Sequence, residues 1–90
     1  MKKPIHTDYV KVKFMNLLRS RHNVESLYVT PGTIESIIEE ICTQVPDITE
    51  KELEDAVMFI NRQKVMHLNR KKEIVNAGDE IVFTNFVGGG

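Results

Sequence analysis

The sequence has a single cysteine, Cys42, which excludes an internal disulfide framework. Acidic and basic residues nearly balance, and the formal net charge of −1 gives no electrostatic reason to expect binding to nucleic acid or to a membrane. No apolar run approaches the length of a bilayer, and the opening "MKKPIHTDYV" is not followed by the apolar core of a signal peptide. We therefore expect a cytoplasmic protein.

Residues that signal catalysis are also scarce. His6, His22 and His67 are scattered, and no set of His, Cys and carboxylate residues has the spacing of metal ligands. Gly32 and Gly78 are isolated turn glycines, so the chain contains no glycine-rich loop for phosphate. The sequence thus predicts no catalytic residue, no metal site and no bound cofactor.

What the sequence does contain is the pattern of one small globular domain. Its 90 residues are 41% hydrophobic and 28% charged, which is typical of a soluble domain with its own core. In "VKVKF", Val10, Val12 and Phe14 alternate with two lysines, the pattern of a half-buried strand. Strands are expected at 10–14, 24–30, 56–60, 64–68 and 80–86. The segment "MNLLRSRHN" fits either a single helical turn or an irregular connection.

One amphipathic helix is expected between the second and third strands. Thr33 follows a Pro-Gly turn and offers its hydroxyl as an N-cap, and Pro46 ends the helix. Six apolar residues recur at helical spacing: Ile34, Ile37, Ile38, Ile41, Cys42 and Val45. On this stripe Cys42 is more simply a small buried side chain than a nucleophile. With strands before and after one helix, the sequence predicts an α+β fold in which a mixed sheet is covered on one face.

Two shorter segments have simple interpretations. "TEKE", beginning at Thr49, has the spacing of a capping box and predicts a short helical turn that carries Leu53. The basic run Arg70-Lys71-Lys72 is interpreted as a solvated loop tip.

The last strand runs almost directly into Gly88, Gly89 and Gly90. Four extended residues from Val87 would reach roughly 13 Å, and glycines without side chains can thread a narrow cleft. We therefore expect a domain over residues 1–87 and a flexible glycine tail over residues 88–90, which presents a terminal carboxylate to another protein.

The sequence resembles the ubiquitin-like sulfur carriers, namely the small subunit of molybdopterin synthase (MoaD-like) and the thiamine sulfur carrier (ThiS-like). The resemblance extends from Val10 to Gly90 and rests on "VKVKF", "VTPGTIESIIEEI", "MFINRQKV" and "NAGDEIVF...VGGG", which follow the family's order and spacing. It implies a β-grasp fold, a mixed sheet wrapped over the helix that starts at Thr33.

The resemblance also implies a carrier rather than an enzyme. A ubiquitin-activating-type enzyme would use ATP to adenylate Gly90, which Gly89 precedes, and a sulfur donor would convert the adenylate to a thiocarboxylate. A synthase subunit would then accept the sulfur. The body suits the molybdopterin type, but Asn85-Phe86 replaces the Pro-Pro pair common there, and "FVGGG" is closer to thiamine carriers. Two alternatives stay open: a protein modifier whose Gly90 forms isopeptide bonds, and a β-grasp interaction module without acyl chemistry.

A docking surface for these partners is expected beside the tail. If Ile81 and Phe83 face the core, alternation places Val82, Thr84 and Phe86 on the open face of the sheet. The family's "MFIN" segment puts Phe59 on the same face. Because exposed apolar patches often mark binding sites, the sequence predicts that these residues form a partner interface leading to Val87 and the glycines.

Overall fold

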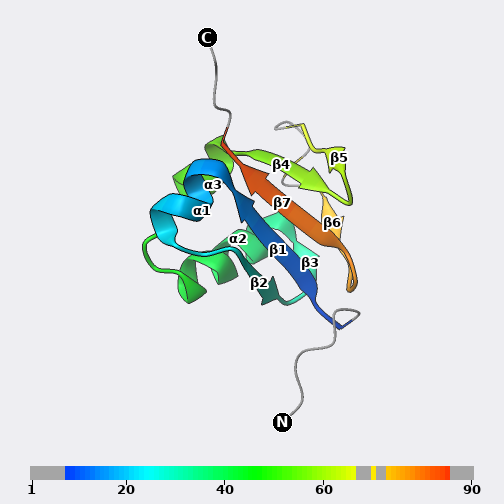
Figure 1. Ribbon diagram of the computed structural model, residues 1–90. Helices are drawn as coiled ribbons and strands as arrows, with labels where there is room; N and C mark the ends of the chain where they lie inside the picture. Colours follow the sequence, from blue (N-terminus) through cyan, green and yellow to red (C-terminus); the bar gives the residue numbers. More distant parts are fainter. Residues whose placement is uncertain (1–7, 67–69, 71–72, 86–90) are drawn as a thin grey trace.

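The computed structural model describes residues 8–66, 70 and 73–85, which form one layer of sheet with helices packed beneath it (Figure 1). The elements are, in chain order, β1 (Val10–Met15), α1 (Asn16–His22), β2 (Ser26–Val29), β3 (Gly32–Thr33), α2 (Ile34–Gln44), α3 (Glu50–Asp55), β4 (Val57–Ile60), β5 (Gln63–Lys64), β6 (Ile74–Val75) and β7 (Glu80–Thr84). The predicted tail, residues 88–90, and its junction at Val87 lie outside the described residues.

The main sheet has five strands in the order β2-β1-β7-β4-β5. Its two central strands, β1 and β7, run parallel, whereas the other neighbours are antiparallel. Short strands β3 and β6 form a separate antiparallel pair beside the start of α2. The predicted mixed sheet is therefore confirmed.

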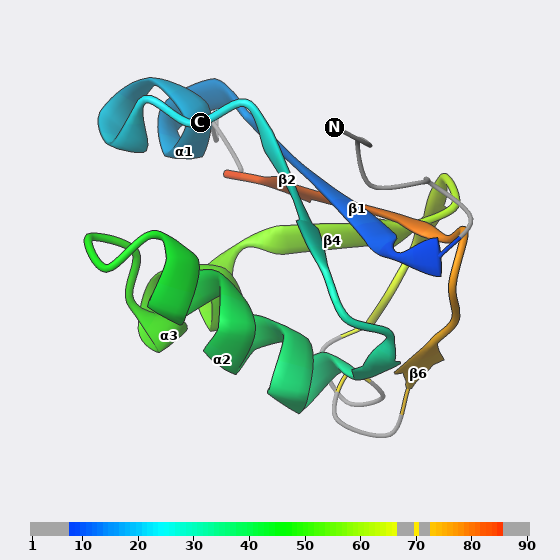
Figure 2. The same cartoon turned by 90° about the horizontal axis from the view of Figure 1, so that it is seen from below.

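Helices α2 and α3 cover one face of this sheet, and α1 lies at the end where β1 finishes (Figure 2). The hydroxyl of Thr33 accepts a hydrogen bond from the amide of Ser36 at 3.1 Å, so the predicted N-cap is confirmed. All four isoleucines of α2 are buried against the sheet, whereas Val45, expected to be buried with them, is only partly covered. Helix α2 ends at Gln44, and Val45 lies beyond its last turn.

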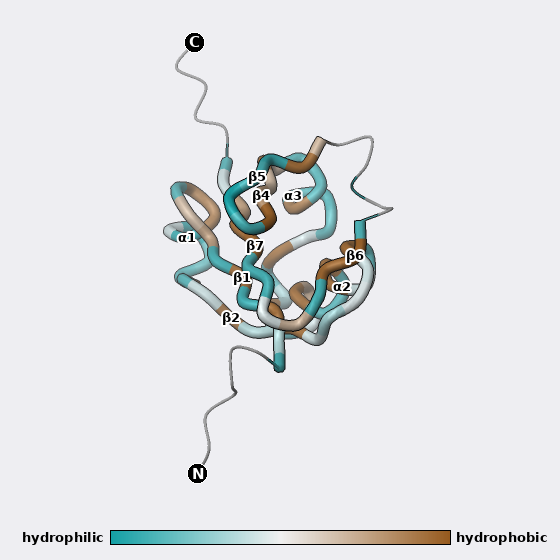
Figure 3. Tube along the Cα trace, turned by 90° about the vertical axis from the view of Figure 1, so that its right-hand side faces the viewer, coloured by the Kyte–Doolittle hydropathy of each residue, from teal (hydrophilic) through white to brown (hydrophobic). Residues whose placement is uncertain are grey.

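The core is continuous between α2 and the inner face of the sheet. Phe14 of β1 stacks on Phe83 of β7 with 6.1 Å between ring centroids, and both are buried. In Figure 3 the hydrophobic segments lie mainly in the strands and α2, while several turns are hydrophilic. The predicted inward set is buried or packed against this core: Val12, Phe14, Leu27, Val29, Ile81 and Phe83.

Several short elements differ from the sequence-based expectation. The segment after β1, which by sequence fits either a single helical turn or an irregular connection, forms the seven-residue helix α1. This helix buries Leu18. Strands β3 and β6 were not predicted, because two-residue strands carry too few positions for a periodic signal. The fourth strand is expected at 64–68, but β5 covers Gln63–Lys64 and Val65 and Met66 are not in a strand. Residues 67 and 68 lie outside the described residues.

Helix α3 begins with the predicted capping box, which also connects two helices. The Thr49 hydroxyl accepts from the Glu52 amide, and the Glu52 carboxylate accepts from the Thr49 amide. The same carboxylate lies 3.0 Å from Nε2 of His22 and 3.3 Å from the guanidinium of Arg21, both in α1. Glu52 therefore holds α1 against α3, at the end of the core that α1 closes.

Arg70 contradicts the expectation of a solvated loop tip. It is only 5% exposed, and its guanidinium donates hydrogen bonds to the carbonyls of Leu53, Glu54 and Ala56 at 3.2, 2.8 and 2.9 Å. The last carbonyls of a helix have no partner within the helix and carry partial negative charge, so a cation is stabilised at the end of α3. Burial lowers the pKa of Arg70, with Glu54 opposing the change. Lys71 and Lys72 lie outside the described residues.

Candidate functional site

The outer face of the main sheet is left open by the helices (Figure 2). On β7, Ile81 and Phe83 are fully buried while Val82 and Thr84 between and after them are half-buried, as strand alternation requires. Phe59 of β4 is half-buried and lies directly opposite Val82 in the antiparallel register. The predicted placement of Phe59, Val82 and Thr84 on the outer face is thus found, whereas their role as a partner interface stays a prediction.

The remaining predicted site residues follow Asn85 in the sequence. Phe86, Val87, Gly88, Gly89 and Gly90 all lie outside the described residues. The last described residue is Asn85, one position beyond β7.

The outer face contains apolar residues that the sequence analysis did not include. Met15 lies opposite Thr84 in the parallel pairing of β1 and β7, and Val57 lies opposite Thr84 on the other side. Met15 is 43% exposed, and Leu17, near the start of α1, is 52% exposed. Met15 could have been found by continuing the alternation of Lys11 and Lys13 by one more step. We define the outer-face patch as Met15, Val57, Phe59, Val82 and Thr84.

A polar contact fixes the end of the patch nearest Asn85. The side-chain amide of Asn16 donates a hydrogen bond to the hydroxyl of Thr84. Asn16 has φ of 57°, in the left-handed region that asparagine tolerates better than most residues. The first residue of α1 is therefore tied to the last residue of β7, so that α1 borders the point where β7 ends.

Cations flank the apolar centre of the patch. One row of direct cross-strand neighbours on the outer face runs from β2 to β5 and consists of Ser26, Lys13, Val82, Phe59 and Lys64. The two apolar side chains in the middle therefore have a lysine on either side. An apolar centre with a charged rim is the usual anatomy of a protein-binding surface.

Groups suited to catalysis do not converge on this surface. Burial raises the pKa of the Cys42 thiol, with smaller contributions from Glu50 and Glu52, so the thiol stays protonated near neutral pH. The described residues contain no cluster of three His, Cys, Asp or Glu side chains placed to hold a metal ion. Within the same described part, no helix has the length and hydrophobicity to cross a membrane.

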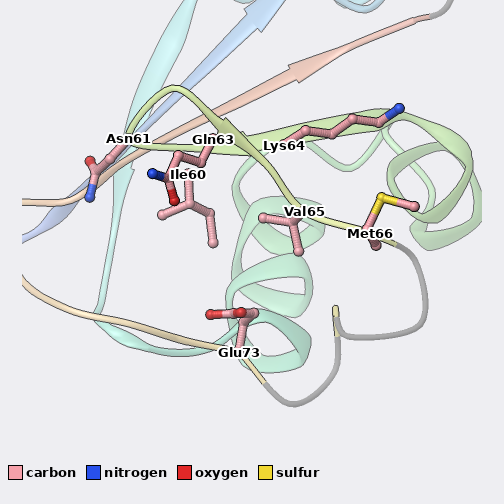
Figure 4. Close-up of a pocket in the computed structure, with 7 residues that line it drawn as sticks. All are labelled: Ile60, Asn61, Gln63, Lys64, Val65, Met66 and Glu73. Carbon is pink, nitrogen blue, oxygen red and sulfur yellow. The ribbon is translucent and has the colours of Figure 1, made fainter.

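A hollow lies at the far end of β4, around the turn to β5 and the residue before β6 (Figure 4). Its lining is formed by Ile60, Asn61, Gln63, Lys64, Val65, Met66 and Glu73. Figure 4 shows the Lys64 side chain extending away from Glu73, so these two charged groups do not converge on one point. We assign no chemistry to this hollow.

These features define a small ubiquitin-like protein, with a mixed sheet packed on one main helix. The chain belongs to the ThiS family, whose sequence profile matches residues 12–90. The predicted resemblance to the ubiquitin-like sulfur carriers is therefore confirmed. The family consists of small carrier proteins rather than enzymes, in agreement with the prediction. No curated protein sequence matches the chain.

Solved structures confirm the β-grasp fold. Small archaeal modifier protein 1 from Methanosarcina acetivorans aligns with a TM-score of 0.76 at 20% identity, covering 94% of this chain and 99% of that one. A putative molybdopterin converting factor subunit 1 from Pyrococcus furiosus gives 0.66 at 21% identity, covering 86% and 95%. A chain from the complex of subunits 1 and 2 of the Helicobacter pylori molybdopterin-converting factor gives 0.58 at 15%, covering 91% and 99%.

Proposed function

We propose that this protein carries sulfur as a thiocarboxylate on Gly90. The observation that supports this most strongly is the match to the ThiS family, which extends over the glycines at the end of the sequence. A carboxylate oxygen is a poor leaving group, so the carboxylate must be activated before sulfur can replace it. In the proposed reaction it displaces pyrophosphate from ATP in the active site of an adenylating enzyme. A sulfide-level donor then displaces AMP, leaving the thiocarboxylate.

The outer-face patch gives the carrier a place to be held during these steps. An adenylating enzyme and a sulfur-accepting subunit would bind the patch in turn, while the residues after Asn85 enter each active site. The Helicobacter pylori structure, a complex of two subunits of molybdopterin-converting factor, supports a synthase subunit as the second partner. The molybdopterin pathway is favoured by the chain's length and the thiamine pathway by its "FVGGG" ending. We also propose a cytoplasmic location.

Intact mass spectrometry of the protein isolated from its native host tests this function. The expected result is a species heavier by the exchange of one carboxylate oxygen for sulfur, with the added mass confined to the fragment that ends at Gly90. Its absence under conditions that demand sulfur transfer would contradict the proposal.

Deletion of Gly90 provides a matched variant. We expect the shortened chain to keep its unfolding midpoint, because the described core ends before residue 86, and to lose ATP-dependent adenylation. A shortened chain that is still adenylated would overturn the assignment of Gly90.

A protein-modifier function is the second candidate. The first solved structure described above bears the name of a modifier, although 20% identity supports the shared fold only. Both functions would begin with adenylation of Gly90, so the distinguishing product is an isopeptide bond between Gly90 and a lysine of another protein. Peptide mass spectrometry of host proteins after trypsin digestion would detect lysines that carry this isopeptide bond.

A further inference from the structure

A second hollow lies along β1, beside the outer-face patch. Its lining includes Lys11, Lys13 and Met15 of β1, Arg19 of α1 and Ser26 at the start of β2. Phe14 and Glu25 complete the lining. We call this feature the basic hollow.

Positive charge exceeds negative charge in the basic hollow. Its lining holds three cationic side chains, Lys11, Lys13 and Arg19, and one carboxylate, Glu25. In the described part of the protein, the ion pairs with a nitrogen–oxygen distance of 4.0 Å or less involve the cations Arg21, His22 and Lys51. None of these pairs includes a cation of the basic hollow. Glu80 is the cross-strand neighbour of Lys11 and offsets part of that charge. Three cations therefore face two carboxylates, Glu25 in the lining and Glu80 beside Lys11, which leaves a net positive charge in the hollow.

The basic hollow and the patch are continuous. Met15 belongs to both, and Lys13 is the direct cross-strand neighbour of Val82. Arg19 is in α1, the helix whose first residue is bonded to Thr84 at the end of β7. A protein seated on Val82 and Thr84 would therefore lie next to the half-buried Lys13 and near α1, which carries the exposed Arg19.

We propose that the basic hollow binds an acidic segment, with at least two neighbouring Asp or Glu side chains, of the protein that docks on the outer-face patch. This inference rests on the proposed function, because that function supplies the docking protein. A carboxylate can accept paired hydrogen bonds from the guanidinium of Arg19, while Lys13 adds a more flexible donor. Charges at the rim of an interface chiefly accelerate association and select the partner, so the hollow would orient the carrier before its tail is inserted.

Nucleic acid fits the hollow less well. A phosphate backbone is usually bound by a longer basic stripe on a basic domain. Here three cations lie beside Glu25 and Glu80 on a chain with a net charge of −1.

A first experiment tests the hollow without any enzyme. The full chain, labelled with ¹⁵N, is titrated at low salt with a short blocked oligoglutamate peptide and, separately, with an oligouridylate of equal charge. We expect peptide-induced shifts concentrated at Lys13, Arg19 and Ser26, reversed by added salt. Equal shifts at the remote exposed Arg62 would mean non-specific attraction, and stronger binding of the oligouridylate would favour nucleic acid. Either outcome would overturn the proposal.

Charge reversal sharpens this test. The double variant Lys13→Glu, Arg19→Glu should weaken peptide binding about tenfold. Arg19→Glu alone should weaken it less, and Arg62→Glu, which reverses one charge at the β4–β5 turn as Arg19→Glu does in α1, should not weaken it. Arg19→Glu alone, at an exposed helical position, serves if the double variant unfolds. Unchanged peptide binding by a folded variant would overturn the proposal.

The closing experiment uses the adenylating enzyme from the same host. The double variant should need about tenfold more carrier for half-maximal ATP consumption, with an unchanged maximal rate, and Arg62→Glu should match the original chain. If the original chain is adenylated and the double variant behaves identically, the basic hollow is not a docking element, while the proposed function stands. If the original chain is not adenylated at all, the proposed function itself fails, and the docking proposal fails with it.

Discussion

The two faces of the same three strands differ in what they contribute. On the inner face, which α2 and α3 cover, Phe14, Met58 and Phe83 are no more than 1% exposed. On the outer face, their strand neighbours Lys13, Phe59 and others are only half-buried, and no described helix covers them. The inner face therefore provides most of the folding free energy, while the outer face can be changed with little loss of stability. A surface that the fold does not require is available for binding.

The largest expected effect comes from the inner face. Ile37 is fully buried in α2, so Ile37→Ala removes packed methylenes and leaves a cavity that should cost about 2–5 kcal/mol of unfolding free energy. Urea denaturation followed by circular dichroism would measure the loss. Glu39→Ala, at an exposed position of the same helix, should change stability by less than about 0.5 kcal/mol. Equal losses of stability in the two variants would contradict the conclusion that buried residues of the inner side provide most of the folding free energy.

A polar contact on the covered side should have the next largest effect. Arg70→Met keeps much of the aliphatic length but removes the hydrogen bonds to three carbonyls at the end of α3. We expect a loss of about 2–4 kcal/mol, since bonds from charged donors are individually stronger than neutral ones. Urea denaturation again provides the measurement, with the exposed Arg62→Met as control. A neutral Arg70→Met would mean that α3 needs no cationic partner.

Arg70 also shows where sequence-based prediction stops. Periodicity and local spacing predicted α2, both N-caps and the inward and outward residues of β1 and β7, because each signal depends on residues a few positions apart. The contact between Arg70 and the end of α3 joins residues at least 14 positions apart, and a run of three basic residues gives no local sign of it. Long-range pairing of this kind requires the fold.

For the candidate site, too, the residues placed by local patterns were predictable from the sequence. Alternation along β7 placed Val82 and Thr84, and the family's "MFIN" segment placed Phe59. The basic hollow could not be predicted, because the sequence after β1 fits either a helical turn or an irregular connection. Arg19 lines the same hollow as Lys13 and Met15 only when this segment forms α1. The glycine tail stays a prediction from sequence alone.

The outer face should show the reverse pattern, with binding affected more than stability. Phe59→Ala removes a half-buried ring and should lower the unfolding free energy by less than about 1.5 kcal/mol, well below a core truncation. If the ring is a central contact, affinity for the adenylating enzyme should fall about thirtyfold, the equivalent of 2 kcal/mol. Isothermal titration calorimetry would measure the affinity. Ile74→Ala is a suitable control, since Ile74 is an exposed apolar residue in β6, away from the patch.

Two outcomes would contradict this assignment. Unchanged affinity of Phe59→Ala would mean that the partners use another surface. A stability loss as large as that of Ile37→Ala would mean that the outer face supports the fold after all.

The smallest expected effect concerns the ion pairs that join α1 to α3. The hydrogen bond from His22 is the largest cause that lowers the pKa of Glu52, and the amide of Thr49 and the charges of His22 and Arg21 lower it further, against an opposing effect of burial. A carboxyl whose pKa is lower in the folded state stabilises the fold when ionised. This stabilisation is complete above the unfolded pKa of about 4.3 and is lost as the pH falls through the folded value.

Glu52→Gln should therefore be less stable than the original chain at pH 7, and the difference should shrink as the pH is lowered below about 4.3. Urea denaturation at a series of pH values would measure it. Because the Glu52 side chain is 23% exposed, solvent screens its charge, and the effect should stay well below that of Ile37→Ala. A difference that is constant with pH would mean that Glu52 acts through the shape of the capping box and not through its charge. Packing, and not charge, would then determine how much each contact on the covered side contributes to the unfolding free energy.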